Sequence, residues 1–341
     1  MLLLLSNTSQ CLSSRVRALR FIKLIIILGH TFLECSSNNW HSAKRTIKTI
    51  VENQSKFYIN GAWVKPMGSE TIEVINPSDE SVIGAIAAGT KEDIDSAVAA
   101  ASSAFHSFGF SNKEDRIKLI EDIITEYEKR SEELAQTISN EMGAPLWLSQ
   151  MAQVTAGLSH FKDTLEVLKS FEFEGTENNY LIRKEPIGVI GMITPWNWPM
   201  NQVTLKVIPA LLAGCTMVLK PSEIAPLSSM VFADILHEAG VPAGVFNMVN
   251  GDGMGVGSQL SGHPDVDMVS FTGSTRAGIA ISKNAADSLK RVHLELGGKG
   301  ANIIFADADE KAVVRGARHC FNNTGQSWCT WFPPSATQVA P

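Results

Sequence analysis

The sequence predicts an α/β fold built around a doubly wound parallel sheet, because short apolar runs alternate with helix-length segments over its second half. The apolar runs are residues 189–193, 216–219, 245–249, 268–271 and 292–296. The segments of helical length between them are residues 200–212, 227–239, 254–261 and 275–286. Continuous apolar runs are typical of strands buried on both faces, and their alternation with helices is typical of parallel sheets. Ligands of such sheets bind beyond the carboxyl ends of the strands, which makes the residues after each run the candidate site.

The composition is that of a soluble globular protein. Of the 341 residues, 44% are hydrophobic and 19% are charged, which is ordinary for a well-packed chain. The formal net charge of -6 disfavours a nucleic-acid-binding surface. The five cysteines form no CxxC pair, so neither a zinc site nor a disulfide framework is indicated, and reduced thiols are expected.

Residues 1–55 differ from the rest of the chain. They contain four basic residues but no acidic residue before Glu34, and the apolar run 24–29 is too short to span a bilayer. We interpret this segment as a disordered or spurious extension of a cytoplasmic protein, and no membrane association is expected. The alternative is a transit peptide, which would predict a mitochondrial protein.

The first third of the chain is predicted to be mainly helical after a small β entry. Residues 57–64 alternate around Asn60-Gly61, which indicates a hairpin, and residues 73–77 indicate a strand entering a turn. Thr90 with Asp93 forms a capping box that opens a helix through residue 105, and Ser111 with Glu114 forms a second one.

The predicted helices end before an extended ribbon. Gly143 is placed to end the helix that resumes at Ser131, and Pro145 to open the next helix, which runs to residue 169. Residues 171–183 are expected to form an irregular ribbon that leads into the sheet.

Two polar loops follow the first two predicted strands. The first, residues 194–201, holds Asn197 between prolines and tryptophans, so its amide is placed to stabilise an oxyanion. The alternative is a turn asparagine bonded to its own backbone. In the second, Lys220 is suited to a phosphate or a ribose hydroxyl, and Glu223 would accept from a ribose 2′-OH and repel a 2′-phosphate. That pair favours NAD over NADP, and the alternative is a solvated ion pair.

Two glycine-containing loops follow the third and fourth strands. Residues 250–257 are glycine-rich, but Val256 breaks a G-x-G-x-x-G match, so a flexible turn explains them equally well. Residues 271–278 combine a strand end, Gly273 and the hydroxyls of Ser274 and Thr275 at the start of a helix. They suit a pyrophosphate at a helix N-terminus, although simple helix capping accounts for them too.

The fifth strand carries Glu295 between two leucines. Desolvation there would make the carboxylate costly to ionise and suits a general base. The alternative is an edge-strand glutamate that faces water. A short strand at residues 301–305, a helix from residue 307 and a segment bearing Cys320 and Cys329 are expected to follow.

Five runs occur in a fixed order, T-P-W-N-W-P, L-K-P-S-E, F-T-G-S-T, L-E-L-G-G-K and F-N-N-T-G-Q-S. Together they resemble the aldehyde dehydrogenase superfamily over residues 56–327. The resemblance implies a Rossmann-like NAD-binding domain at residues 56–297, with a bridging ribbon at about 170–185. It also implies that residues 298–341 are only the start of a catalytic domain.

The resemblance implies a reaction as well. A cysteine thiolate attacks an aldehyde, an asparagine amide holds the oxyanion, hydride passes to NAD, and a glutamate activates water to hydrolyse the thioester. The implied catalytic residues are Asn197, Glu295 and Cys329. The implied cofactor-binding residues are Trp196, Lys220, Glu223, Gly253, Phe271, Gly273 and Ser274. The implied partners are a small-molecule aldehyde and further copies of the chain, since the family forms homo-oligomers.

The sequence departs from the family pattern at its nucleophile. The pattern places that cysteine at position 328, where this chain has Trp328, and Cys329 comes one residue later. One step along an extended chain turns a side chain to the opposite face. The chain also ends at Pro341, whereas the family continues well beyond its nucleophile.

Three readings of the function follow from these departures. The first is a truncated or frame-altered aldehyde dehydrogenase with poor turnover. The second is an NAD-binding protein without catalysis. The third, acyl transfer to coenzyme A, is disfavoured by Glu295, because a water-activating base suits hydrolysis.

Overall fold

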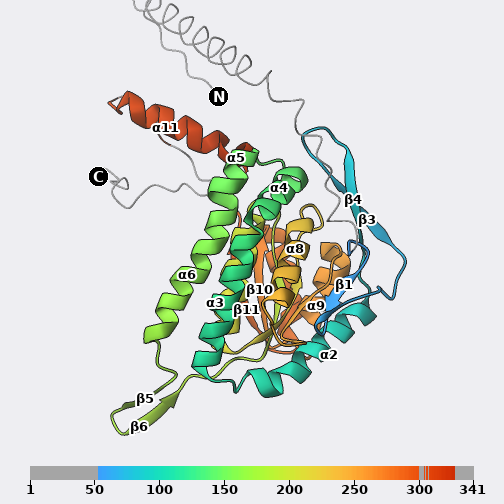
Figure 1. The fold of residues 1–341 in the computed structure, drawn as a ribbon, viewed down its shortest axis with the longest axis vertical. Helices are drawn as coiled ribbons and strands as arrows, with labels where there is room; N and C mark the ends of the chain where they lie inside the picture. Colours follow the sequence, from blue (N-terminus) through green and yellow to red (C-terminus); the bar gives the residue numbers. More distant parts are fainter. Residues whose placement is uncertain (1–52, 299–302, 304, 306, 327–341) are drawn as a thin grey trace, which may run out of the picture. The chain divides into compact units, whose positions relative to one another are not determined.

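The computed structural model describes residues 53–298, 303, 305 and 307–326, and its centre is a seven-stranded sheet (Figure 1). From one edge to the other the strands are β11 (Arg291–Leu296), β10 (Met268–Gly273), β7 (Val189–Ile193), β8 (Thr216–Lys220), β9 (Phe246–Met248), β1 (Phe57–Ile59) and β2 (Ala62–Val64). The first five are parallel, and β1 and β2 add antiparallel. From β7 the chain adds β8 and β9 on one side, and then returns to add β10 and β11 on the other side of β7. This reversal of strand order confirms the predicted doubly wound fold.

Helices cover both faces of the sheet, because the side chains of each central strand alternate between two cores. Ile190 and Met192 pack with α7 (Pro199–Ala213) and α8 (Leu227–Glu238). Val189 and Ile193 belong to the second core. Its helices are α2 (Lys91–Phe108), α9 (Ser258–Gly262) and α10 (Thr275–Ala286). Burial on both faces explains why these strands read as continuous apolar runs.

An outer layer of helices packs on α7 and α8. Its members are α3 (Lys113–Lys129), α4 (Ser131–Met142), α5 (Leu146–Leu148), the π-helical turn η1 (Ser149–Gln153) and α6 (Val154–Ser170). Tyr127 of α3 and Phe161 of α6 are fully buried with ring centroids 5.4 Å apart. Phe161 in turn lies 6.2 Å from Phe232 of α8. Aromatic contacts of this kind fix the outer layer on the helices that support the sheet.

The remaining elements lie outside these layers. Two hairpins are formed by β3 (Thr71–Ile75) with β4 (Val82–Ala87) and by β5 (Glu174–Glu177) with β6 (Tyr180–Arg183). The second hairpin is the predicted ribbon. The short helical elements are η2 (Gly253–Gly257), α11 (Glu310–Phe321) and η3 (Asn322–Gly325). Within the described ranges, no helix has both the length and the apolar character needed to cross a membrane.

Several local predictions are confirmed. Asn60 and Gly61 both have positive φ at the β1–β2 turn, as a two-residue hairpin of this kind requires. Thr90 and Asp93 form the expected capping box at α2, and Gly143 ends α4 in the left-handed conformation.

Three local predictions are wrong or fall largely outside the described residues. The predicted box at Ser111 is absent, because the N-cap position of α3 is Asn112, whose side chain makes no capping hydrogen bond, and the Ser111 hydroxyl instead donates back to Phe108 O at 2.6 Å. The strand β11 is not buried on both faces but alternates between exposed and half-buried residues. Of the predicted strand 301–305 only residues 303 and 305 are described, and neither is in a strand.

Candidate active site

The candidate site lies at the carboxyl edge of the sheet, where β7 and β10 are neighbours. The loop after β7 starts at Thr194, whose N–H donates to Lys220 O at the end of β8 (3.2 Å). The loop after β10 starts beyond Gly273. This is the position where the strand order reverses, and a crevice for ligands is expected there.

The loop after β7 is joined to a turn about 130 residues later. Trp196 Nε1 donates to Gln326 Oε1 at 2.8 Å, and Asn197 Nδ2 donates to the backbone oxygen of Gln326 at 2.9 Å. Asn197 is buried, whereas Trp196 is 44% exposed. The structure therefore places the predicted oxyanion asparagine directly against the segment that precedes Trp328 and Cys329.

The backbone of Asn197 is held as firmly as its side chain. Its carbonyl oxygen accepts from Gln153 Nε2 (3.0 Å) and from Asn323 Nδ2 (2.8 Å). Gln153 Nε2 also donates to Asn323 Oδ1 at 2.8 Å. The alternative that Asn197 bonds only its own turn is thus not what the structure shows. Gln153 was not identified from the sequence, because its hydrogen-bond partners lie far away along the chain.

The turn that receives Asn197 has an unusual backbone. Asn323 and Thr324 both have positive φ, 52° and 57°. Such values are uncommon for residues other than glycine and persist only where neighbouring contacts impose them. The hydrogen bonds to Asn323 supply that constraint, and Gln326 N closes the turn on Asn323 O at 3.0 Å.

The predicted ribose-binding pair lies at the end of β8. Lys220 is buried, and its Nζ donates to Glu223 Oε2 at 2.7 Å. The Glu223 side chain is 34% exposed. The two residues are therefore not a fully solvated ion pair, which was the alternative. The lysine is buried within the protein, while the carboxylate remains accessible to a ligand.

The loop after β10 has the geometry of a helix N-terminus. Ser274 caps α10 by accepting from Ala277 N at 3.2 Å, so the capping function that the sequence allowed is present. A Cβ at Gly273 would lie 2.5 Å from the buried Phe271 ring, so only glycine fits beside that ring. Gly253 starts η2 and has open space beside it. Apart from its chain neighbours, no atom lies within 4 Å of the position that a Cβ would occupy.

Glu295 lies on β11, the outer strand of the described sheet. Its side chain is 53% exposed, and its Oε1 lies 3.6 Å from His293 Nε2. Glu295 is in register with Thr272, one residue beyond the level of Ile193 on β7. Two strand spacings, about 10 Å in total, separate β11 from β7. Asn197 and Glu295 therefore share one edge of the sheet, but the glutamate has the exposed, edge-strand setting of the alternative reading.

Lys206 is a site-region residue that the sequence reading missed. It lies on α7 and is buried, and its Nζ donates to Ser270 Oγ of β10 at 3.0 Å. Burial lowers the pKa of this lysine to about 8, while the carboxylate of Glu295 acts in the opposite direction. The available signal was that Lys206 is the only charged residue of α7, since a lysine is almost never buried without a partner.

Cys329, the predicted nucleophile, and Trp328 lie outside the described residues. Cys215 is described and is buried at the start of β8, where burial raises the pKa of its thiol. A raised pKa disfavours the thiolate, so Cys215 does not suit a nucleophile.

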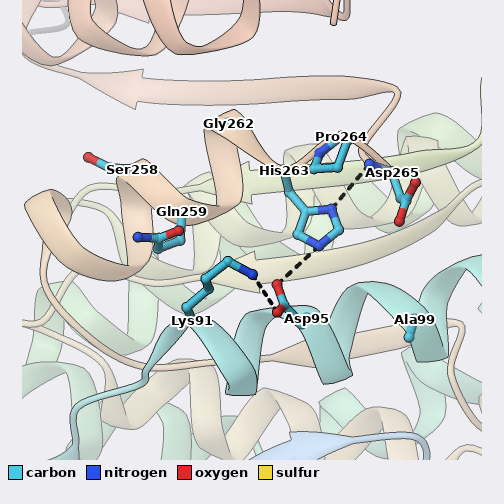
Figure 2. A pocket seen from close by; sticks show the side chains of 9 residues that line it. All are labelled: Lys91, Asp95, Ala99, Ser258, Gln259, Gly262, His263, Pro264 and Asp265. Carbon is cyan, nitrogen blue, oxygen red and sulfur yellow. Dashed lines mark hydrogen bonds and ion pairs between the residues drawn. The ribbon is translucent and has the colours of Figure 1, made fainter.

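A hollow of about 430 Å³ lies away from this edge, between α2 and the residues around α9 (Figure 2). Lys91 Nζ lies 2.6 Å from Asp95 Oδ2, and His263 Nε2 lies 3.3 Å from Asp95 Oδ1. Both Lys91 and His263 thus already contact a carboxylate of the same chain. None of the predicted site residues lines it.

Comparison with known proteins finds similarity over most of the chain. Residues 63–332 match the model of the aldehyde dehydrogenase family. A 3-succinoylsemialdehyde-pyridine dehydrogenase from a Pseudomonas species is 53% identical over 274 residues, which are 80% of this chain and 57% of that protein. The chain therefore spans less than three fifths of the length of this relative.

Solved structures of aldehyde dehydrogenases are also similar to this chain, again over only part of their length. A crystal structure of an aldehyde dehydrogenase from Bartonella henselae has 57% identity and a TM-score of 0.79, with 81% of this chain and 59% of that chain covered. Aldehyde dehydrogenase C from Pseudomonas syringae, a mutant complexed with NAD+ and octanal, has 47% identity and a TM-score of 0.79. There 81% of this chain and 57% of that chain are covered.

Proposed function

This chain belongs to the aldehyde dehydrogenase family, and from that premise we propose that it binds NAD and contributes to the oxidation of an aldehyde to a carboxylic acid. The proposed substrate is a small or medium aldehyde. The octanal complex of the similar Pseudomonas syringae protein supports that size and supplies a probe.

The observation that carries the proposal is the setting of the Asn197 amide. Its nitrogen carries two hydrogens, and the backbone oxygen of Gln326 takes one of them at 2.9 Å. The second is the donor that we assign to the oxyanion formed when a thiolate adds to the aldehyde. A donor fixed before the reaction stabilises developing charge without reorganisation, which is why such groups are effective.

The residues after β8 and β10 fit the dinucleotide. Glu223 is exposed enough to accept from the adenosine ribose and would repel a 2′-phosphate, which favours NAD over NADP. Lys220 holds that carboxylate in place. The exposed first turn of α10 at Ser274 suits the pyrophosphate, and the open space at Gly253 leaves room for it. When bound, NAD supplies the acceptor for the hydride of the aldehyde.

The remaining chemistry is assigned to a thiolate and a carboxylate. We assign the nucleophile to Cys329, whose sulfur would bond to the aldehyde carbon and leave a thioester once hydride has departed. We assign Glu295 as the base that takes a proton from water as the water attacks this thioester. Hydrolysis releases the carboxylic acid and returns the thiol.

Purified full chain tests the proposal in two steps. Calorimetric titration with NAD, and with NADP as comparison, is expected to show tighter binding of NAD. Mixing with NAD and octanal is expected to form NADH, and Cys329→Ala is expected to abolish it. Absence of NAD binding would overturn the proposal as a whole.

A second candidate function is NAD binding without turnover, and Trp328 favours it because it occupies the position of the family's nucleophile. Trapping of thiols with an alkylating reagent separates the two functions. Protection of Cys329 by octanal supports the enzyme. Tight NAD binding together with a Cys329 that octanal does not protect supports the second candidate.

A further inference from the structure

We propose that Gln153 is a positioning residue of this site, which aligns the Asn197 amide with the turn that leads to the nucleophile. The inference rests on the proposed function for its catalytic consequence. It rests on the structure for the contacts, which join residues 44 and 170 positions apart in the sequence.

The placement of Gln153 depends on a π-helical turn. In η1 the N–H of Val154 bonds to Ser149 O, five residues earlier, in contrast to the four-residue step of the adjoining α-helix. A π-turn inserts one residue into a helix and is often found at functional sites. Gln153 is the last residue of this turn and is fully buried. Gln153 thus directs its amide inward from this turn, whereas Gln150 of the same turn is exposed.

Two side-chain amides and one backbone carbonyl are joined by three hydrogen bonds. Gln153 Nε2 donates to Asn197 O and to Asn323 Oδ1, and Asn323 Nδ2 donates to Asn197 O. Every donor in this set faces an oxygen. Rotation of the Gln153 amide by half a turn would place its oxygen against two other oxygens, so one orientation alone is compatible with the surroundings.

This arrangement controls the direction of the Asn197 side chain. With its carbonyl held by two donors, the backbone of Asn197 has little freedom, and its Nδ2 is directed to Gln326 O. Gln153 also holds Asn323 in its left-handed conformation, and that turn sets where Gln326 lies. Loss of Gln153 would therefore misalign both sides of the proposed oxyanion site, and small misplacements of this kind are costly to catalysis.

Gln153→Leu tests the inference, with Gln150→Leu as its matched control. Gln150 belongs to the same π-turn but is exposed and donates to Glu132 at 2.9 and 3.1 Å. We expect Gln153→Leu to lower the rate of NADH formation by roughly 10- to 100-fold, with the Kd for NAD unchanged. Gln150→Leu is expected to stay within about twofold of the parent. A full rate in Gln153→Leu would overturn the inference.

Gln153→Glu adds a readout that loss of folding alone would not give. An ionised carboxylate at this position faces Asn197 O and Asn323 Oδ1 and repels both. A protonated carboxyl regains one donor. The rate of this variant relative to the parent is therefore expected to rise as pH falls, and a ratio independent of pH would contradict the proposal. This arm also applies if Gln153→Leu does not fold.

A third measurement separates failure of the inference from failure of the proposed function. If the parent chain forms no NADH, the proposed function fails, and the position of the loop is then followed by NMR of tryptophan indole groups labelled with ¹⁵N. The Trp196 indole donates to Gln326 Oε1, and Trp196→Phe assigns its signal. Gln153→Leu is expected to shift this signal and Gln150→Leu to leave it in place. An unshifted signal in Gln153→Leu would show that Gln153 does not position the loop.

Discussion

Asn197 and Glu295, the proposed oxyanion donor and the proposed base, differ in burial and in the number of their hydrogen bonds. Asn197 is buried, and its amide and carbonyl groups take part in three hydrogen bonds to residues of two other segments. Glu295 is half exposed on the outer strand of the described sheet, and its Oε1 lies 3.6 Å from His293 Nε2. Both lie at the carboxyl edge, but only one of them is held there by contacts within the described residues.

The difference shows which half of the site is organised by folding itself. The entropy of orienting Asn197 is lost when the chain folds, because η1, the loop after β7 and the η3 turn must all pack to form its contacts. The orientation of Glu295 is set only by its strand, which fixes the face but not the rotamer. The proposed oxyanion donor is thus preorganised in this structure, whereas the proposed base keeps rotational freedom.

The largest effect is expected from Asn197→Asp, which keeps the shape of the side chain and removes its donor. A carboxylate oxygen would then face Gln326 O. We expect a loss of roughly 100- to 1,000-fold in NADH formation, as for removal of an oxyanion donor. The free energy of unfolding is expected to fall by about 1–3 kcal/mol, because a buried carbonyl loses its partner. Urea unfolding and single-turnover kinetics with octanal measure the two quantities.

Asn178→Asp is the control for this change. Asn178 lies in the exposed turn between β5 and β6, so the same chemical change there is expected to leave both quantities near the parent values. Equal losses in the two variants would show that the burial and hydrogen bonds of Asn197 have no special effect.

An intermediate effect is expected from Lys206→Met, which should raise the free energy of unfolding rather than lower it. Burial lowers the pKa of Lys206 from 10.5 to about 8, so the folded protein binds this proton less tightly than the unfolded chain does. Its stability contribution is therefore least favourable below pH 8, and stability rises with pH between about 8 and 10.5. At about 1.4 kcal/mol per pKa unit, and with the Ser270 hydrogen bond lost, methionine should stabilise the protein by roughly 1–2 kcal/mol at pH 7.

The measurement is the free energy of unfolding of parent and variant from pH 7 to 10. The parent is expected to gain stability over this range through Lys206, and the variant to lack that gain. Curves that run parallel would show that Lys206 does not carry the lowered pKa. Lys206 belongs to α7, the helix that follows the Asn197 loop; its amine donates to Ser270 Oγ, and the negative charge of Glu295 acts on it electrostatically.

The fold could be predicted from the sequence because its signals are local. The strands and α10 follow from apolar runs, the β1–β2 turn from Asn60-Gly61, and the start of α2 from Thr90 with Asp93. In each of these cases the physical cause lies within a few residues. The predicted box at Ser111 is absent because two local hydrogen bonds compete for the same hydroxyl. Ser111 Oγ donates to the carbonyl oxygen of Phe108 and does not cap the next helix.

The supports of the candidate site could not be predicted in this way. Asn197 was identified from its stiff loop, but Gln153 has no local signal, because a π-turn and two distant partners give it its role. For Glu295 the sequence left two settings open, a desolvated base and an edge-strand glutamate that faces water. Its flanking leucines pack on the core under one face of β11, while the strand alternates and turns the glutamate to the other face.

The smallest effect on stability is expected from Glu295→Gln, and it sharpens the contrast with Asn197 most directly. Because the carboxylate is half exposed and its contact with His293 Nε2 spans 3.6 Å, the free energy of unfolding should change by less than about 0.5 kcal/mol. His293→Gln is the matched control, since it removes the other member of the pair and should have an equally small effect. A loss above about 1 kcal/mol in Glu295→Gln alone would mean that the glutamate is held by specific hydrogen bonds, as Asn197 is. Both halves of the site would then be preorganised by folding.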